Sequence, residues 1–320
     1  MSVPIGIFIN KTFFAAQCGI FCIKEVFALA DSQKQIVQWF PGHMAKTRRL
    51  ITESLSSVDA VTELLDARIP ESSRNPELGE IIGQKPRIVL LNKCDLADEQ
   101  ATAQWIAYFK KQGSAALAVD CRSGKGLNQY RNTVRTVLAD LVKRNEERGM
   151  AGKALRIMVV GIPNTGKSSF INRMAGSAKA KVEDRAGVTR HNQWFFIGGG
   201  IELLDTPGVL WPKFDDPAVG DKLAFTGGVK DVVLDIESLA VRLCSILMND
   251  YPDRLIERYK IKDFAECEPW QVLEMIGRKR GMLISGGEID TERASIMLLD
   301  ELRAGRLGRL TFERPSGGLL

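Results

Sequence analysis

The chain has 320 residues, which is long enough for about two domains that each bury an apolar core. Apolar residues make up 45% of the sequence and charged residues 26%, a balance that excludes disorder throughout. The net charge of +5 is uneven: residues 32–220 carry 27 Lys and Arg against 20 Asp and Glu, whereas residues 221–320 carry 15 against 17. The positive excess of the first part suits an anionic ligand without identifying one.

The first 35 residues are apolar and aromatic, but their pattern is not that of a membrane span. Their longest charge-free run, residues 12–23, lies between Lys11 and Lys24 and is too short to cross a bilayer. The extreme N-terminus also lacks the basic residues of a secretory leader. We expect residues 1–35 to be a poorly ordered extension or an over-long gene start.

The six cysteines form no CxxC pair and have no histidine spacing typical of a zinc site. We interpret them as reduced thiols of a cytosolic protein. Cys18 and Cys22 are four residues apart, a spacing that favours packing on one helix face over chemistry.

Short apolar runs bounded by turn residues alternate with helical patterns over residues 36–220. This alternation predicts an α/β domain with a mostly parallel sheet and helices on both faces. In such a fold the loops at the carboxyl ends of the strands carry the ligand. The predicted strands are residues 36–40, 58–65, 87–91, 115–120, 155–160, 193–197 and 201–205.

Two helical regions follow from the spacing of apolar residues. One long helix is predicted over residues 128–148, where apolar residues recur at helical spacing up to Lys143 and Arg144. Beyond residue 220 the strand patterns fade, and helices are predicted at residues 236–248, 252–259, 270–278 and 291–304. We therefore divide the chain into an extension (1–35), an α/β domain (36–220) and a smaller all-helical domain (221–320).

A guanine-reading motif, Asn92-Lys93-Cys94-Asp95, follows the predicted strand 87–91. A carboxylate at Asp95 can accept two hydrogen bonds from guanine, whereas adenine has no such donor pair at that edge. The four-residue motif is weak alone and gains value from its companions. Asp120-Cys121, after strand 115–120, occupies the place of a second base-binding loop, although its side chains are poorly diagnostic.

A phosphate-binding motif gives the strongest local signal. Residues 161–168, GIPNTGKS, fit G-x-x-x-x-G-K-[ST] and directly follow the predicted strand 155–160. The backbone N–H groups of such a loop wrap phosphates, Lys167 supplies a charge, and the Ser168 hydroxyl ligates Mg²⁺. A glycine-rich turn without a ligand is the competing interpretation. The predicted nucleotide-binding residues of this loop are Asn164, Thr165, Gly166, Lys167, Ser168 and Ser169.

A third motif, residues 205–208 (DTPG), ends the predicted strand 201–205. Asp205 can hold Mg²⁺ through water, and the Gly208 N–H can approach the γ-phosphate and sense its presence. Thr189, which lies between the second and third motifs, is a candidate to complete the Mg²⁺ shell. A surface threonine with no ligand is the alternative there.

The order of the motifs differs from that of a conventional GTPase, because the guanine motif precedes the phosphate loop. All these loops lie on one edge of a sheet, so a circular permutation preserves the site. The permuted chain leads from the γ-phosphate sensor through residues 209–212 towards the helical domain, and we hypothesise that nucleotide state repositions that domain.

The residue that orients the attacking water is also unusual. Many GTPases place a glutamine after the DxxG glycine, whereas this chain has Val209 and Leu210. His43, in a predicted turn before a helix, is the candidate replacement. By physical argument alone it is as readily a helix-start residue without a chemical role.

The motifs resemble the circularly permuted ribosome biogenesis GTPases, the YlqF/YawG-type family. The segments that carry the resemblance are residues 38–46 (QWFPGHMAK), 66–70 (DARIP), 73–76 (SRNP), 92–95, 161–168, 204–213 (LDTPGVLWPK), 251–255 (YPDRL) and 308–313 (GRLTFE). The sequence departs from the family at Asp120-Cys121, where Asn-Ser is commoner, and in residues 1–35.

The resemblance implies a GTP hydrolase that binds GTP, GDP and Mg²⁺ and acts in late assembly of the large ribosomal subunit. It implies weak intrinsic hydrolysis that the particle stimulates, with His43 in place of the missing glutamine and Asn164 linked to a K⁺ requirement. Its expected partners are the rRNA and proteins of the large-subunit precursor. We expect a cytoplasmic chain that is monomeric off the ribosome and does not bind a membrane. A GTP-dependent binding switch with little hydrolysis and an ATP-using P-loop enzyme are the alternatives.

Overall fold

The computed structural model describes residues 41–176, 193–206, 208, 216–229 and 235–315, with side chains from residue 48 onward in the first helix. The described residues all belong to one unit of the chain, Val37–Leu320. The expectations for residues 1–35, for a strand at 36–40 and for Thr189 therefore lie outside the described residues. In the part described, no helix is long and apolar enough to span a membrane.

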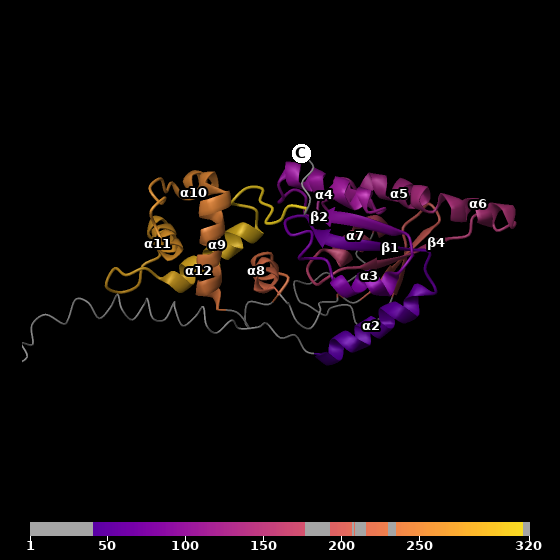
Figure 1. Ribbon diagram of the computed structural model, residues 1–320, viewed down its shortest axis with the longest axis horizontal. Coiled ribbons are helices and arrows are strands. Elements are labelled where there is room, and N and C mark those ends of the chain that lie inside the picture. Colours follow the sequence, from indigo (N-terminus) through magenta and orange to yellow (C-terminus); the bar gives the residue numbers. More distant parts are fainter. Residues whose placement is uncertain (1–40, 177–192, 207, 209–215, 230–234, 316–320) are drawn as a thin grey trace, which may run out of the picture. The chain divides into compact units, whose positions relative to one another are not determined.

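The described part of the GTPase-like region is built on a six-stranded sheet with the order β3-β2-β1-β4-β6-β5, of which β2, β1 and β4 are labelled in Figure 1. All neighbouring pairs are parallel except β5 and β6, which are antiparallel. The predicted α/β fold is confirmed, and each predicted strand in the described range ends within two residues of an observed one. The strands are β1 (Ala60–Asp66), β2 (Arg87–Asn92), β3 (Ala115–Ala118), β4 (Leu155–Val160), β5 (Gln193–Phe196) and β6 (Ile201–Asp205).

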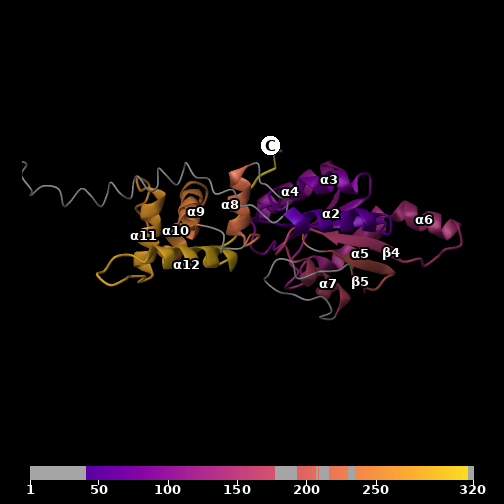
Figure 2. The same ribbon diagram turned by 90° about the horizontal axis from the view of Figure 1, so that it is seen from below.

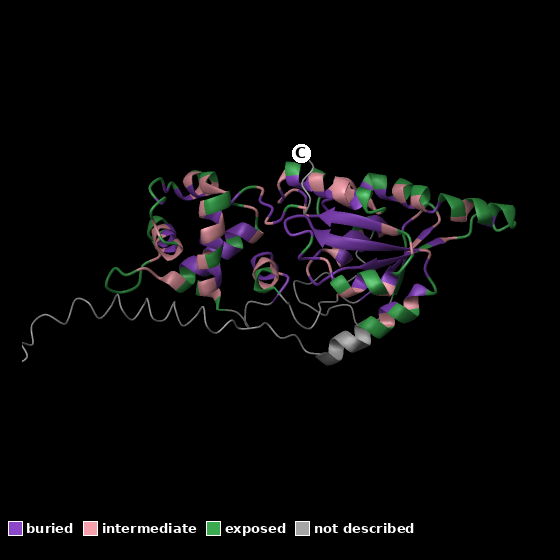
Figure 3. Ribbon diagram, in the orientation of Figure 1, coloured by how far each residue is buried: buried purple, intermediate pink, exposed green. Residues whose placement is uncertain are grey.

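Helices cover both faces of the sheet because the parallel strands are apolar on both sides. All seven residues of β1 are buried (Figure 3), and its apolar side chains face opposite sides of the sheet, Ala60 and Leu64 on one side and Val61 and Leu65 on the other. On one face Ile51 and Leu78 pack against Val61. On the other face Tyr130 packs with Leu64. The helices of the first face are α2 (Pro41–Leu55), α3 (Pro76–Ile82) and α4 (Glu99–Lys111), and α7 (Lys167–Ala175) lies on the second.

The prediction of one continuous helix over residues 128–148 is wrong. The chain forms a short 3-10 turn η1 (Leu127–Gln129), then α5 (Tyr130–Val137) and α6 (Ala139–Glu147). The helices are separated at Leu138, whose φ of −105° and ψ of 20° leave the helical region. Leu138 stays in the apolar core, whereas Asn145 is the only buried residue of α6. The bend therefore lets a mostly exposed helix follow one that buries Tyr130 and Val134, and apolar spacing alone does not reveal it.

The C-terminal region is helical, as predicted. Its helices are α8 (Pro217–Phe225), α9 (Ile236–Asp250), α10 (Pro252–Tyr259), α11 (Pro269–Lys279) and α12 (Thr291–Arg303). They share one apolar cluster, in which Leu243, Val272 and Leu298 are fully buried. The boundary predicted after residue 220 falls inside α8, which runs unbroken across it.

Candidate functional site

The predicted ligand loops lie at one edge of the sheet. Because β1, β2, β3, β4 and β6 run parallel, their carboxyl ends meet there, whatever their order in the sequence. The guanine motif follows β2 and the phosphate motif follows β4, and β1 lies between these two strands. The permuted chain order thus leaves the spatial order of a nucleotide site intact.

The phosphate loop ends at Gly166, where the backbone conformation and the nearby atoms require glycine. Gly166 has a φ of 97°, and a Cβ atom there would lie 2.3 Å from the Asn92 Nδ2. The Thr165 hydroxyl donates to the Ile162 carbonyl at 2.9 Å and holds the loop from within. The loop leads directly into the N-terminus of α7, where free N–H groups and the helix dipole favour an anion.

Lys167 lies under the loop rather than in solvent. Its Nζ donates to the carbonyls of Gly161 at 3.0 Å and Ile162 at 2.9 Å. Burial lowers the pKa of Lys167 from 10.5 to about 8, although the nearby Asp205 carboxylate acts in the opposite direction. A Cβ atom at Gly208 would lie 2.9 Å from this Nζ, so the DTPG motif meets the phosphate loop at the lysine.

The depressed pKa predicts proton uptake on nucleotide binding. Above pH 8 the amine is largely neutral in the free protein, and phosphate restores its charge, so binding takes up a proton. We expect little uptake from Lys167 at pH 7 and about 0.9 proton at pH 9, measured by calorimetry in buffers of different ionisation enthalpy. The Lys167→Arg variant, whose charge does not titrate in this range, should lose the difference. Equal uptake at both pH values would contradict the assignment.

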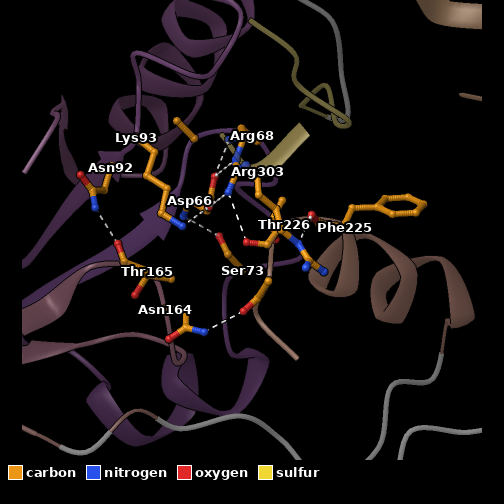
Figure 4. Close-up of polar contacts among 12 residues, drawn as sticks. Asp66, Arg68, Ser73, Asn92, Lys93, Asn164, Thr165, Phe225, Thr226 and Arg303 are labelled. Atoms are coloured by element: carbon orange, nitrogen blue, oxygen red, sulfur yellow. Dashed lines mark hydrogen bonds and ion pairs between the residues drawn. The ribbon is translucent and has the colours of Figure 1, made fainter. Parts of the chain in front are cut away.

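Asn92 connects three loops of the candidate site. Its Nδ2 donates to the Thr165 carbonyl at 2.6 Å (Figure 4), and its Oδ1 accepts from the Cys121 N–H at 3.0 Å. The first residue of the guanine motif therefore connects the phosphate loop to the second base loop, and its contact with the base stays a prediction. Its side-chain amide supplies both the donor and the acceptor that this position uses.

Lys93 is held by a buried carboxylate that the sequence motifs did not single out as a site residue. Its Nζ lies 3.0 Å from Asp66 Oδ2, and the same oxygen accepts from Arg68 Nη2 at 2.7 Å. Burial alone would raise the pKa of Asp66, but Arg68 and Lys93 together hold it well below its usual value. The signal available in the sequence was the charged pair in DARIP, directly after a fully buried strand.

The other residues predicted to lie near the guanine base differ in how deeply they are buried. Asp95 is partly exposed, with Arg122 Nη2 at 3.9 Å, so its carboxylate is open to a ligand. Burial raises the pKa of Cys94 and Cys121, and both thiols stay protonated at neutral pH. The Asp120 carboxylate accepts from the N–H groups of Arg122 at 2.8 Å and Ser123 at 3.2 Å. Asp120 therefore shapes its own loop.

The oxygen atoms near the phosphate loop fit a Mg²⁺ ion whose remaining ligands are phosphate and water oxygens. Asp205 is buried at the end of β6, and Ser168 is the second residue of α7. Within the described ranges no three His, Cys, Asp or Glu side chains gather as a metal site. One carboxylate and one hydroxyl, completed by phosphate and water, is the arrangement that Mg²⁺ prefers at nucleotides. Thr189 lies outside the described residues.

Two side chains of the site reach the segment that follows α8. Asn164, with a φ of 61°, donates from Nδ2 to the Gly227 carbonyl at 2.8 Å. Arg68 Nη2 lies 3.4 Å from the Thr226 carbonyl (Figure 4). From the helical region, Arg303 donates to the Ala224 carbonyl at 2.8 Å. Residues 224–227 thus contact the phosphate loop on one side and α12 on the other.

The tail segment, residues 307–314, forms a second connection that sequence reasoning missed. The Leu310 N–H donates to the Leu96 carbonyl at 3.0 Å, just beyond the guanine motif. The Phe312 N–H donates to the Arg68 carbonyl at 2.8 Å. Glu313 accepts from the Glu71 N–H at 2.7 Å. These partners are more than 200 residues apart along the chain, so no local pattern indicates the pairing.

His43 was expected in a turn, but the helix α2 already begins at Pro41, where proline suits the first helical position. His43 therefore lies in the first turn of α2. Its side chain lies outside the described residues, and its role stays a prediction.

The chain is similar to several characterised proteins. Residues 156–270 match the family described as "50S ribosome-binding GTPase". It is 46% identical to ribosome biogenesis GTPase A of Bacillus cereus over 88% of this chain and 94% of that protein. The corresponding protein of Priestia megaterium is 48% identical over 88% of this chain and 97% of its own length. That of Thermotoga maritima is 33% identical over 87% and 95%.

Solved structures agree with these relatives. GDP-bound YlqF superposes with a TM-score of 0.58 at 30% identity, over 83% of this chain and 99% of that one. GNP-bound YlqF from T. maritima gives a TM-score of 0.56 at 29% identity, over 85% and 99%. The chain therefore belongs to the ribosome biogenesis GTPase A family and is a GTP hydrolase.

Proposed function

We propose that this GTPase acts in late assembly of the large ribosomal subunit and that the ribosomal particle stimulates its hydrolysis. The observation that carries the proposal is the contact of two loops of the site with residues 226–227: Asn164 of the phosphate loop bonds to Gly227, and Arg68 of the loop after β1 bonds to Thr226. A change at the phosphates can thereby reach α8 and the helical region. The name of the matched family, which refers to the 50S ribosome, supports the large subunit as the target.

The residue roles follow from the motifs and their positions. The guanine base is bound by Asn92, Lys93, Cys94 and Asp95, with the backbone of Asp120 and Cys121, and the phosphates by residues 164–169 and Gly208. Ser168, Thr189 and Asp205 hold Mg²⁺, which neutralises phosphate charge when it is bound. Asn164 also places its amide oxygen for K⁺, and its Nδ2 bond to Gly227 leaves that oxygen free to act as a ligand. His43 orients the attacking water.

Two parts of the chain have separate roles on the ribosomal particle. The residues before α8 form the GTPase domain, and the residues from α8 onward form a helical domain for RNA and ribosomal proteins. The chain works in the cytoplasm, and it is a monomer until it joins the large-subunit precursor. The mild positive charge of residues 32–220 supports contact with rRNA.

Sedimentation and single-turnover hydrolysis test the proposal together. We expect the protein to sediment with large-subunit particles in a non-hydrolysable GTP analogue and to be released in GDP. Particles should accelerate hydrolysis in K⁺ buffer, and His43→Ala should remove the acceleration while leaving GTP affinity unchanged. Association that is indifferent to the nucleotide would reject the assembly role.

The alternative is a GTP-dependent binding switch with little hydrolysis. It predicts the same nucleotide-dependent sedimentation, but no acceleration by particles and no effect of His43→Ala on the rate. The two proposals therefore separate on the rate measurement alone.

A further inference from the structure

The turn that carries Asp95 ends on a residue that the C-terminal part of the chain holds in place. The Leu96 N–H donates to the Lys93 carbonyl at 2.9 Å. This bond closes a four-residue turn in which Asp95 is the third residue. The direction of the Asp95 side chain therefore depends on where Leu96 is held.

Leu96 is held through both its backbone and its side chain. Its carbonyl accepts from the Leu310 N–H at 3.0 Å. A Cβ atom at Gly305, just beyond α12, would lie 2.5 Å from the Leu96 Cδ2, so this side chain packs directly against glycine backbone. Gly305 also has a φ of 72°, a second reason for glycine at this position. Leu96 is thus held between the end of α12 and the tail segment.

Thr311, the residue after Leu310, joins the same loop to the helical region. Its hydroxyl accepts from the Asp98 N–H at 3.0 Å. Its backbone pairs twice with one side chain, because the Tyr251 hydroxyl donates to the Thr311 carbonyl at 2.6 Å and accepts from the Thr311 N–H at 3.1 Å. Tyr251 is the residue between α9 and α10 (Figure 2). A single phenol hydroxyl therefore connects the tail segment, and through it the loop after β2, to the helical region.

Burial and charge both support this connection. Thr311 is 3% exposed, so breaking its bonds would leave buried polar groups without partners. Beside it, the Arg309 guanidinium forms an ion pair with Glu99 on α4. Glu99, and more weakly Asp95, raises the pKa of Arg309, which places this positive charge within electrostatic reach of the guanine motif. Because Arg309 and Glu99 are largely exposed, their pair contributes little by itself, and the buried bonds of Thr311 carry the connection.

We propose that Tyr251 and Thr311 are positioning residues for guanine recognition, which hold the turn that carries Asp95. They act through the turn rather than on the nucleotide itself. A carboxylate that accepts two hydrogen bonds from one base edge tolerates little displacement, because both bonds depend on distance and angle. The inference rests on the proposed role of Asp95 as the guanine reader. It goes beyond that role because it makes guanine affinity depend on the helical region, and by linkage a bound guanine base stabilises the same contacts.

Displacement of a fluorescent GDP analogue by GDP and by IDP tests the positioning role in the full-length protein. IDP carries hypoxanthine, which lacks the amino group of guanine, so it offers Asp95 one hydrogen bond instead of two. Tyr251→Phe should bind GDP about 3- to 10-fold more weakly, and its preference for GDP over IDP should shrink by about 3-fold. Thr311→Val, which replaces the hydroxyl by a methyl group, should act in the same direction. Thr311→Ser, which keeps the hydroxyl, should retain the preference.

Tyr259→Phe is the matched control, because it removes the same hydroxyl at the other end of α10. The Tyr259 hydroxyl donates to Glu301 at 2.8 Å within the helical region. The GDP affinity and the preference of this variant should match the wild type. A smaller folded fraction weakens the apparent binding of GDP and IDP by the same factor, so the preference separates positioning from stability.

The outcomes distinguish this inference from the assignment of Asp95. A wild-type preference in both Tyr251→Phe and Thr311→Val, with the preference lost in Asp95→Asn, would overturn the positioning role alone. An unchanged preference in Asp95→Asn would overturn the guanine reader and this inference with it. An equal loss of preference in Tyr259→Phe would also reject the positioning role, because the effect would then not depend on the bond between Tyr251 and the tail segment.

Discussion

The Asp95→Asn variant is expected to bind GTP about 10²- to 10⁴-fold more weakly and to gain affinity for XTP. Two hydrogen bonds from guanine to a carboxylate contribute about 1.5–3 kcal/mol each, and the amide cannot accept both. Xanthine presents a carbonyl where guanine has its amino group, and the amide of the variant side chain can donate to that carbonyl. Asp95 is partly exposed and beside Arg122, so the substitution leaves no buried group unpaired. Competition binding with GTP, XTP and ATP measures the change.

Asp98→Asn is the matched control for this experiment. It makes the same change three residues away, where the Asp98 side chain caps α4 by accepting from the Ala101 N–H at 2.7 Å. Asparagine caps helices about as well as aspartate, so stability and GTP affinity should hardly change. If both variants lose GTP affinity equally, the effect is one of loop charge, and Asp95 is not the guanine reader.

The fold and the loops of the site follow from local sequence. Strands such as β4 are short apolar runs between turn residues, and in a parallel sheet their carboxyl ends must meet at one edge. The sequence motifs alone predict that Asn92 and Lys167 lie in adjacent loops. These predictions succeed because each depends on period, spacing and strand direction, which are local properties.

The features that were missed depend on contacts between distant residues. Nothing near Leu138 distinguishes a bend from a continuous helix, because the apolar spacing is the same on both sides. The bonds of Asn92 to Thr165 and Cys121, which join three loops, were likewise not predicted. The tail segment pairs with loops more than 200 residues earlier, and only the folded chain brings Glu313 to Ser72.

Glu313→Ala is expected to lower the free energy of unfolding by about 3 kcal/mol or more. The Glu313 carboxylate accepts from the N–H groups of Glu71 and Ser72 and from the Ser72 hydroxyl, and it lies 3.2 Å from the Lys222 ammonium. Alanine leaves the buried Ser72 donors without an acceptor, which costs more than the net contribution of the bonds themselves. Glu313→Gln keeps an acceptor but not the charge and should lose less. Urea unfolding of the full-length chain measures both.

Glu257→Ala is the control, because Glu257 is 67% exposed and pairs with Arg254 at 3.2 Å on the surface of α10. Exposed pairs contribute about 0–1 kcal/mol, so this variant should unfold close to the wild type. Equal losses for positions 313 and 257 would contradict a structural role for the tail.

A selective loss at Glu313 would instead mean that the tail segment holds the loop after β1 in place. That loop carries Arg68, which contacts both Asp66 and the segment after α8. The tail, through Arg68, and the phosphate loop, through Asn164, would then act on the neighbouring residues 226 and 227, and nucleotide state would be coupled to the helical region through both.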